Sequence, residues 1–144
     1  MGYLVAYRVL SFAKMTRQFG KIREVVPEHA ETWEDRVFLT FDLDWCTDEV
    51  LEYTIELVEK AGAPATWMVT HDTPLLERLH ANDRFEVGIH PNFEPLLNGN
   101  FTKGSSAEEV VGQLLSFIPE AKTVRSHSMA QSNHLLNIVR WELY

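Results

Sequence analysis

The sequence contains a single cysteine, Cys46, so no disulfide can form within the chain. Because disulfides are rare in reducing compartments, this scarcity favours one of them. No apolar run reaches the ~18 residues that a membrane-spanning helix needs. Arg8 interrupts the apolar stretch of the first 13 residues, and no clear small-residue cleavage site follows it. These absences predict a cytoplasmic protein without a transmembrane segment.

Glycine and proline are also scarce, with 7 and 6 residues among 144, and no heptad pattern is sustained. Collagen-like and coiled-coil classes are therefore excluded. Hydrophobic residues make up 45% and charged residues 24%, which is ordinary for a globular domain and excludes wholesale disorder. The length allows one domain with its own core.

Basic residues are outnumbered, 13 against 21 acidic ones, which gives a formal net charge of -8. A phosphate backbone requires a basic face, so nucleic acid is not the expected partner. The first 26 residues are the exception, because they hold five basic side chains and one acidic side chain. Such a segment can bind a membrane surface or an acidic partner, but it is more often a solvated helix face.

Hydrophobic periodicity predicts a helix over residues 4–26 and then a polar linker, so residues 1–35 are interpreted as an N-terminal helical extension. From residue 36 to 144, short β-rich runs alternate with amphipathic segments. The pattern predicts strands at 37–41, 65–70, 85–90 and 122–126, and helices at 47–60, 73–80, 106–118 and 131–139. Since the strands read as buried on both faces, we expect an α/β fold with a parallel sheet or part of a barrel.

Three residues are expected to start helices. Thr47 precedes two acidic residues, Pro74 is placed at the first helical position, and Ser106 opens a Ser-x-x-Glu capping box.

Polar side chains follow every predicted strand at its carboxyl end, where parallel α/β folds gather their working residues. They are Asp42, Asp44, His71, His90, Arg125 and His127. Aspartate and histidine together suit a divalent ion such as zinc, and a second carboxylate beside a ligand can take a proton from water. The sequence therefore predicts a hydrolytic metal site.

Each of these signals alone has a simpler interpretation. An Asp-x-Asp after a strand is typical of helix-capping loops, and a single histidine at a strand end is often only a satisfied polar group. Cys46 suits packing better than metal binding. Trp45 and Trp67 suit a core or pocket wall better than a sugar platform, although an aromatic beside a polar site can do both.

Four segments together resemble the polysaccharide deacetylases, the NodB homology family (carbohydrate esterase family four). Residues 38–44 are similar to its first motif, residues 63–70 to its second strand, and residues 86–93 to its His-bearing third strand. Residues 124–128 lie where the family has its Arg motif. The combination is most similar to deacetylase-like proteins of surface polysaccharide and O-antigen synthesis, and it covers about residues 36–140.

The resemblance implies a deformed (β/α) barrel of seven strands that removes an N-acetyl group from a sugar with a divalent metal, usually zinc. It implies that Asp42 is the general base, that Arg125 holds its carboxylate, and that Asp44 and His90 are metal ligands. The expected partner is an N-acetylated sugar or polysaccharide precursor. We expect the substrate to contact His71, Trp45 and Asn92.

The resemblance breaks down at two points. Glu94 stands where the family usually has a second histidine, so the third ligand is open between Glu94 and His127, with His71 a further candidate. The chain also reaches only about four strands, and the family's later motifs, with the histidine that protonates the leaving amine, have no counterpart. We therefore expect a partial barrel whose open sheet edge is covered by a partner or a second copy, and weak deacetylase activity from this chain alone.

Two other functions fit the same residues. One is a non-catalytic remnant or binding module, which the missing general acid favours. The other is a different metal-dependent hydrolase such as a phosphoesterase, because His and Asp ligands do not fix the substrate.

Overall fold

The computed structural model describes residues 19–143. Its centre is a parallel sheet of three strands in the order β3 (Thr40–Asp42), β4 (Ala65–Val69) and β5 (Phe85–Ile89). All residues of β4 and β5 are buried, as expected for strands covered on both faces. A separate parallel pair joins β1 (Phe19–Gly20) to β2 (Val37–Phe38). The predicted α/β class and parallel pairing are confirmed, and the described strands do not close into a barrel.

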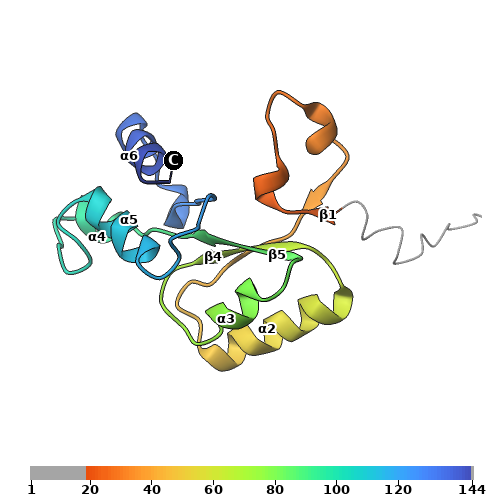
Figure 1. Ribbon diagram of the computed structural model, residues 1–144. Coiled ribbons are helices and arrows are strands. Elements are labelled where there is room, and N and C mark those ends of the chain that lie inside the picture. Colours follow the sequence, from red (N-terminus) through yellow and green to blue (C-terminus); the bar gives the residue numbers. More distant parts are fainter. Residues whose placement is uncertain (1–18, 144) are drawn as a thin grey trace, which may run out of the picture.

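Helices occupy both sides of this sheet. They are α2 (Asp48–Ala61), α3 (Leu76–His80), α4 (Glu94–Leu97), α5 (Ala107–Leu115) and α6 (Asn133–Leu143). Short 3-10 turns are η2 (Ile22–Glu24), η3 (Ala30–Thr32) and η4 (His127–Met129). Figure 1 shows α2 and α3 below the sheet, with the N-terminal segment and α6 above it. No described helix has both the length and the apolar character to cross a membrane.

Helix α2 forms as the sequence predicts. Leu51, Ile55 and Val58 lie one helical turn apart and are buried on the same face. Gly62 ends the helix in the left-handed region, with φ of 63°, and its N–H donates to the Glu59 carbonyl at 2.9 Å. The helix packs on a core centred on Trp67, which is 1% exposed and therefore a core residue rather than a pocket wall.

The N-terminal region differs from its prediction. Residues 4–18 of the expected helix lie outside the described residues, and the described remainder forms β1 and η2 instead of an α-helix. Buried Glu86 explains why this segment turns inward: its Oε2 accepts hydrogen bonds from the Arg23 N–H at 3.0 Å and Thr66 Oγ1 at 2.8 Å. Three neutral donors surround the carboxylate, the third being Thr123 Oγ1. Tertiary hydrogen bonds thus override the local helical period.

Smaller differences affect element bounds. The expected strand 37–41 divides at Leu39 into β2 and β3. Helix α3 begins at Leu76 rather than at Pro74, because Thr73 Oγ1 accepts from the Leu75 N–H and holds Pro74 in the preceding turn. Helix α6 runs over 133–143 instead of 131–139. Ser106 caps α5 as predicted, accepting from the Glu109 N–H at 3.3 Å.

The expected fourth strand, 122–126, is reduced to one parallel bridge between Val124 and Ile89. The segment still runs beside β5 through backbone hydrogen bonds. Gly88 makes this approach possible, since a Cβ at that position would lie 2.5 Å from the Thr123 carbonyl oxygen. The residues that follow, Arg125 and His127, are thereby brought to the carboxyl ends of β3 and β5.

We predict that Gly88→Ala lowers the free energy of unfolding by about 2–3 kcal/mol, because backbone rather than a flexible side chain blocks the added methyl group. Urea unfolding followed by circular dichroism measures the change. The matched control is Gly112→Ala in α5, where nothing lies within 4 Å of the added Cβ. That change is expected to be neutral or stabilising by up to about 1 kcal/mol. Equal effects of the two substitutions would contradict this interpretation of Gly88.

Candidate metal site

The site begins where β3 ends. Asp42 is the last residue of the strand, and the chain then turns sharply, with Asp44 at φ of 42° and Trp45 at φ of 60°. Left-handed backbone at non-glycine residues costs on the order of 1–3 kcal/mol each and is concentrated at functional sites. Thr70 stabilises the turn by accepting the Trp45 N–H at 3.2 Å. The turn gives the two carboxylates separate surroundings.

Asp44 lies against two histidines. Its Oδ1 is 3.3 Å from His90 Nε2 and 3.1 Å from His127 Nδ1. One ligand atom from each of these three residues lies within 4.8 Å of the others. Two imidazoles and one carboxylate match the donor set of zinc sites. In the part of the chain that the structure describes, this is the group of side chains that suits a metal ion.

His90 is held for such a role by its second nitrogen. The side chain is 3% exposed, and Nδ1 donates to the Arg125 carbonyl oxygen at 2.5 Å. A proton on Nδ1 leaves a free lone pair on Nε2, the atom that faces Asp44. Metal-binding histidines commonly have this arrangement, with the remote N–H bound to a backbone carbonyl. The residues present therefore fit a divalent ion.

The second carboxylate, Asp42, is bound to Arg125. The guanidinium donates from Nε at 2.9 Å and from Nη2 at 2.5 Å, both to Oδ1, and its Nη1 donates to Thr40 Oγ1 at 2.9 Å. His90 Nδ1 lies 3.7 Å from the same oxygen, too far for a hydrogen bond. Sequence reasoning missed Thr40. Its place two residues before Asp42, on the same face of the strand, is the signal that could have identified it.

The structure separates the candidates for the third ligand. Glu94 is the first residue of α4, its N–H donates to Asn92 Oδ1 at 2.9 Å, and its carboxylate is not part of the three-residue group. His71 pairs with Thr70, Nδ1 to Oγ1 at 2.8 Å, and is also outside the group. This arrangement favours His127 over both.

Cys46 stands apart from the cluster as well. Burial raises the pKa of its thiol, and the neighbouring Asp48 and Asp44 carboxylates raise it further. The side chain packs against the hydrophobic core. These features agree with a packing role.

A small pocket of about 110 Å³ adjoins the metal cluster. Its lining includes Trp45, Thr70, His90, Asn92 and Lys103. Trp45 is 41% exposed and contacts the His127 ring edge-on at 5.3 Å between centroids. Trp45 and Asn92, two of the predicted substrate contacts, therefore line one cavity with His90. Lys103 was not singled out in the sequence, where nothing distinguishes it from other loop lysines.

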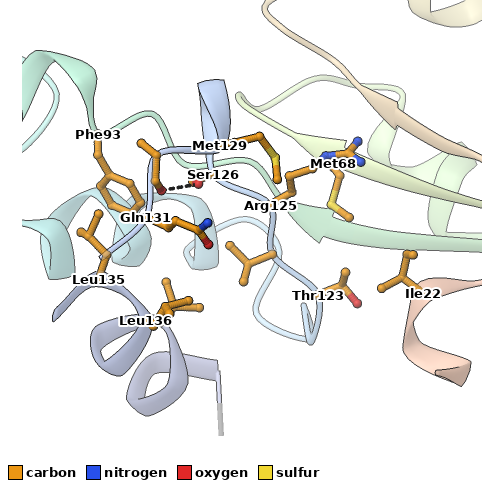
Figure 2. Close-up of a pocket in the computed structure, with 13 residues that line it drawn as sticks. Ile22, Met68, Phe93, Thr123, Arg125, Ser126, Met129, Gln131, Leu135 and Leu136 are labelled. Atoms are coloured by element: carbon orange, nitrogen blue, oxygen red, sulfur yellow. Dashed lines mark hydrogen bonds between the residues drawn. The ribbon is translucent and has the colours of Figure 1, made fainter. Parts of the chain in front are cut away.

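A larger pocket of about 290 Å³ includes Arg125 in its lining (Figure 2). Its lining is mainly apolar and includes Met68, Phe93, Leu135 and Leu136. Without a carboxylate or a histidine, it does not suit a metal.

Comparisons with known proteins identify the family. Residues 39–143 match the family model described as WbmS-like polysaccharide deacetylase. A crystal structure of a proposed polysaccharide deacetylase involved in O-antigen biosynthesis (WbmS), from Bordetella bronchiseptica, is 43% identical with a TM-score of 0.82. It is matched over 88% of this chain. The chain therefore belongs to the WbmS-like polysaccharide deacetylase family.

The same comparison shows how much of the Bordetella relative this chain corresponds to. The chain spans about half the length of that relative, since 52% of the relative's chain is covered. No curated protein matches the sequence.

We predict that the chain binds one zinc ion and that Asp44→Ala, His90→Ala or His127→Ala each weakens binding by about tenfold or more. Titration against a zinc-competing chromophore measures the affinity, and elemental analysis after dialysis measures the stoichiometry. Glu94→Ala and His71→Ala are the matched controls, expected to bind as the parent chain does. If Glu94→Ala loses zinc while His127→Ala retains it, the third ligand is assigned wrongly.

Proposed function

We propose that this chain binds zinc through Asp44, His90 and His127 and hydrolyses the N-acetyl group of a sugar belonging to a surface polysaccharide. One observation carries the proposal: an oriented carboxylate, Asp42, lies beside the three-residue cluster and belongs to a different ion pair. The substrate class is supported by the family match and by the description of the Bordetella relative as involved in O-antigen biosynthesis.

Each side chain has a distinct task in this reaction. Asp42 is the base that accepts a proton from the attacking water, and Arg125 fixes the orientation of its carboxylate. Thr40 in turn orients the guanidinium. Asp44, His90 and His127 would hold a divalent ion, which would supply Lewis acidity for the amide carbonyl and the attacking water. Asn92 and Trp45 line the neighbouring pocket and contact the sugar.

The leaving amine also requires a proton. Among the described residues at the strand ends, His90 and His127 belong to the cluster, and His71 is hydrogen-bonded to Thr70. A positioned general acid contributes about 10²–10⁴-fold in rate. We therefore expect this chain to turn over substrate far more slowly than a site that has such an acid. The Arg125 guanidinium is engaged by Asp42 and Thr40 and is therefore not available to a scissile phosphate, which disfavours a phosphoesterase.

The test is acetate release from N-acetylated sugar oligomers with zinc, cobalt or nickel supplied. Asp42→Asn is expected to reduce the rate by about 10²-fold or more while zinc content stays unchanged. Thr40→Val, which removes only the support of Arg125, is expected to reduce the rate by about three- to tenfold. Metal-dependent release that survives Asp42→Asn would remove Asp42 from the mechanism. Zinc binding without acetate release from any oligomer would favour the binding-module alternative.

A further inference from the structure

Lys103 places a cation at the mouth of the small pocket. Its Nζ lies 4.6 Å from the centroid of the Trp45 ring, within the range of a cation–π contact. Both side chains line the cavity that includes His90 and Asn92. The lysine comes from the loop between α4 and α5, about 60 residues after the tryptophan, so tertiary structure alone brings them together.

The backbone on either side of Lys103 is fixed. Before it, Asn100 Oδ1 accepts from the N–H and the hydroxyl of Thr102 at 3.1 and 2.8 Å. After it, buried Gly104 adopts φ of 133° and packs so tightly on α5 that a Cβ would lie 2.9 Å from Val110 Cγ2. Trp45 is fixed by Thr70 and by its ring contact with His127. The backbone that carries the pair is therefore preorganised, which lowers the entropic cost of binding a ligand there.

The charge of Lys103 is not matched by a nearby carboxylate. Asp44 is engaged with two histidines, and the Glu109 carboxylate accepts from the N–H and the hydroxyl of Ser105 at 2.7 and 2.9 Å. Within residues 19–143, no ion pair of Lys103 forms at 4.0 Å or less. In a chain with 21 acidic residues, a cation beside the site without an acidic partner suits an anionic ligand.

We propose that Lys103 and Trp45 form a subsite for an anionic group on the N-acetylated sugar. This inference rests on the proposed function and specifies its substrate class: an acidic amino sugar or a sugar phosphate. Trp45 contacts the apolar face of the ring, and the Lys103 ammonium donates hydrogen bonds to the carboxylate or phosphate oxygens. Because His90 lines the same small pocket, the anion and the N-acetyl group belong to one monosaccharide or to neighbouring units.

The test compares binding of three probes to the zinc-loaded chain by calorimetry: N-acetylglucosamine, N-acetylglucosaminuronic acid and N-acetylglucosamine 1-phosphate. We expect at least one anionic probe to bind about tenfold more tightly than the neutral sugar, and the better of the two identifies the source of the charge. Lys103→Met should remove about five- to tenfold of that affinity and change neutral-sugar binding by less than about twofold. Lys103→Arg should retain the preference, and added salt should reduce it in the parent chain.

Lys60→Met, an exposed lysine on α2, is the matched control and should change nothing. An anion bound directly to zinc would keep its affinity in Lys103→Met, which would overturn the proposal. Equal binding of all three probes to the parent chain, no binding of any of them, or equal loss of neutral and anionic binding in Lys103→Met would overturn it too. Acetate release at the same rate from neutral and anionic sugars rejects the subsite alone. A retained anionic preference without acetate release rejects the hydrolytic function alone.

Discussion

The site depends on the backbone pairing of residues 123–127 with β5 and the residues that follow it. The Ile89 N–H donates to the Thr123 carbonyl, the Arg125 N–H to the Ile89 carbonyl, and the His127 N–H to the Pro91 carbonyl, at 2.9, 3.1 and 2.9 Å. These bonds advance in register with the chain direction, as parallel pairing requires. They place the Arg125 carbonyl at His90 Nδ1 and the His127 ring beside Asp44. One short pairing thus positions Arg125 against Asp42, His127 against Asp44, and the Nδ1 proton of His90.

The same arrangement gives the two nearby carboxylates, Asp42 and Asp44, different partners. Asp42 faces a permanent cation, Arg125, whereas Asp44 faces two imidazoles that are neutral when they bind a metal. Two residues apart on a regular strand, both side chains would point in one direction. The left-handed turn at Asp44 and Trp45 sends them to different partners. A second pair of left-handed residues, Ser128 and Met129, directly follows His127 in the chain. The strained backbone is therefore next in sequence to two of the candidate ligands, Asp44 and His127.

The sequence predicts the features that depend on residues close together in the chain better than those that depend on residues far apart. Burial of whole strands and the period of α2 are local signals, and they place β4, β5 and their carboxyl ends correctly. The order of polar residues at strand ends then predicts that Asp42 and Arg125 lie at one edge of the sheet, because parallel strands align those ends. The pairing of the two side chains is implied by the resemblance to the polysaccharide deacetylases. The inward turn at Arg23 depends on Glu86, and the position of Lys103 depends on Trp45, both about 60 residues away. No periodicity encodes such contacts, nor the left-handed turns at residues that rarely adopt them.

The face of the sheet opposite α2 and α3 holds an apolar pocket and the N-terminal residues that the structure describes (Figure 1). The N–H groups of Ile22 and Arg23 donate hydrogen bonds to Thr66 and Glu86 on this face. Helix α6 borders the 290 Å³ apolar pocket, which is lined by Leu135 and Leu136 (Figure 2). Apolar side chains beside it, such as Leu136 at 55% and Met129 at 66%, are exposed, and contiguous apolar surface of this kind marks contact sites. The expectation of a partner or second copy on an open edge stays a prediction. Arg125 lines this apolar pocket and also donates to the Asp42 carboxylate, so the pocket and the candidate metal site share one side chain.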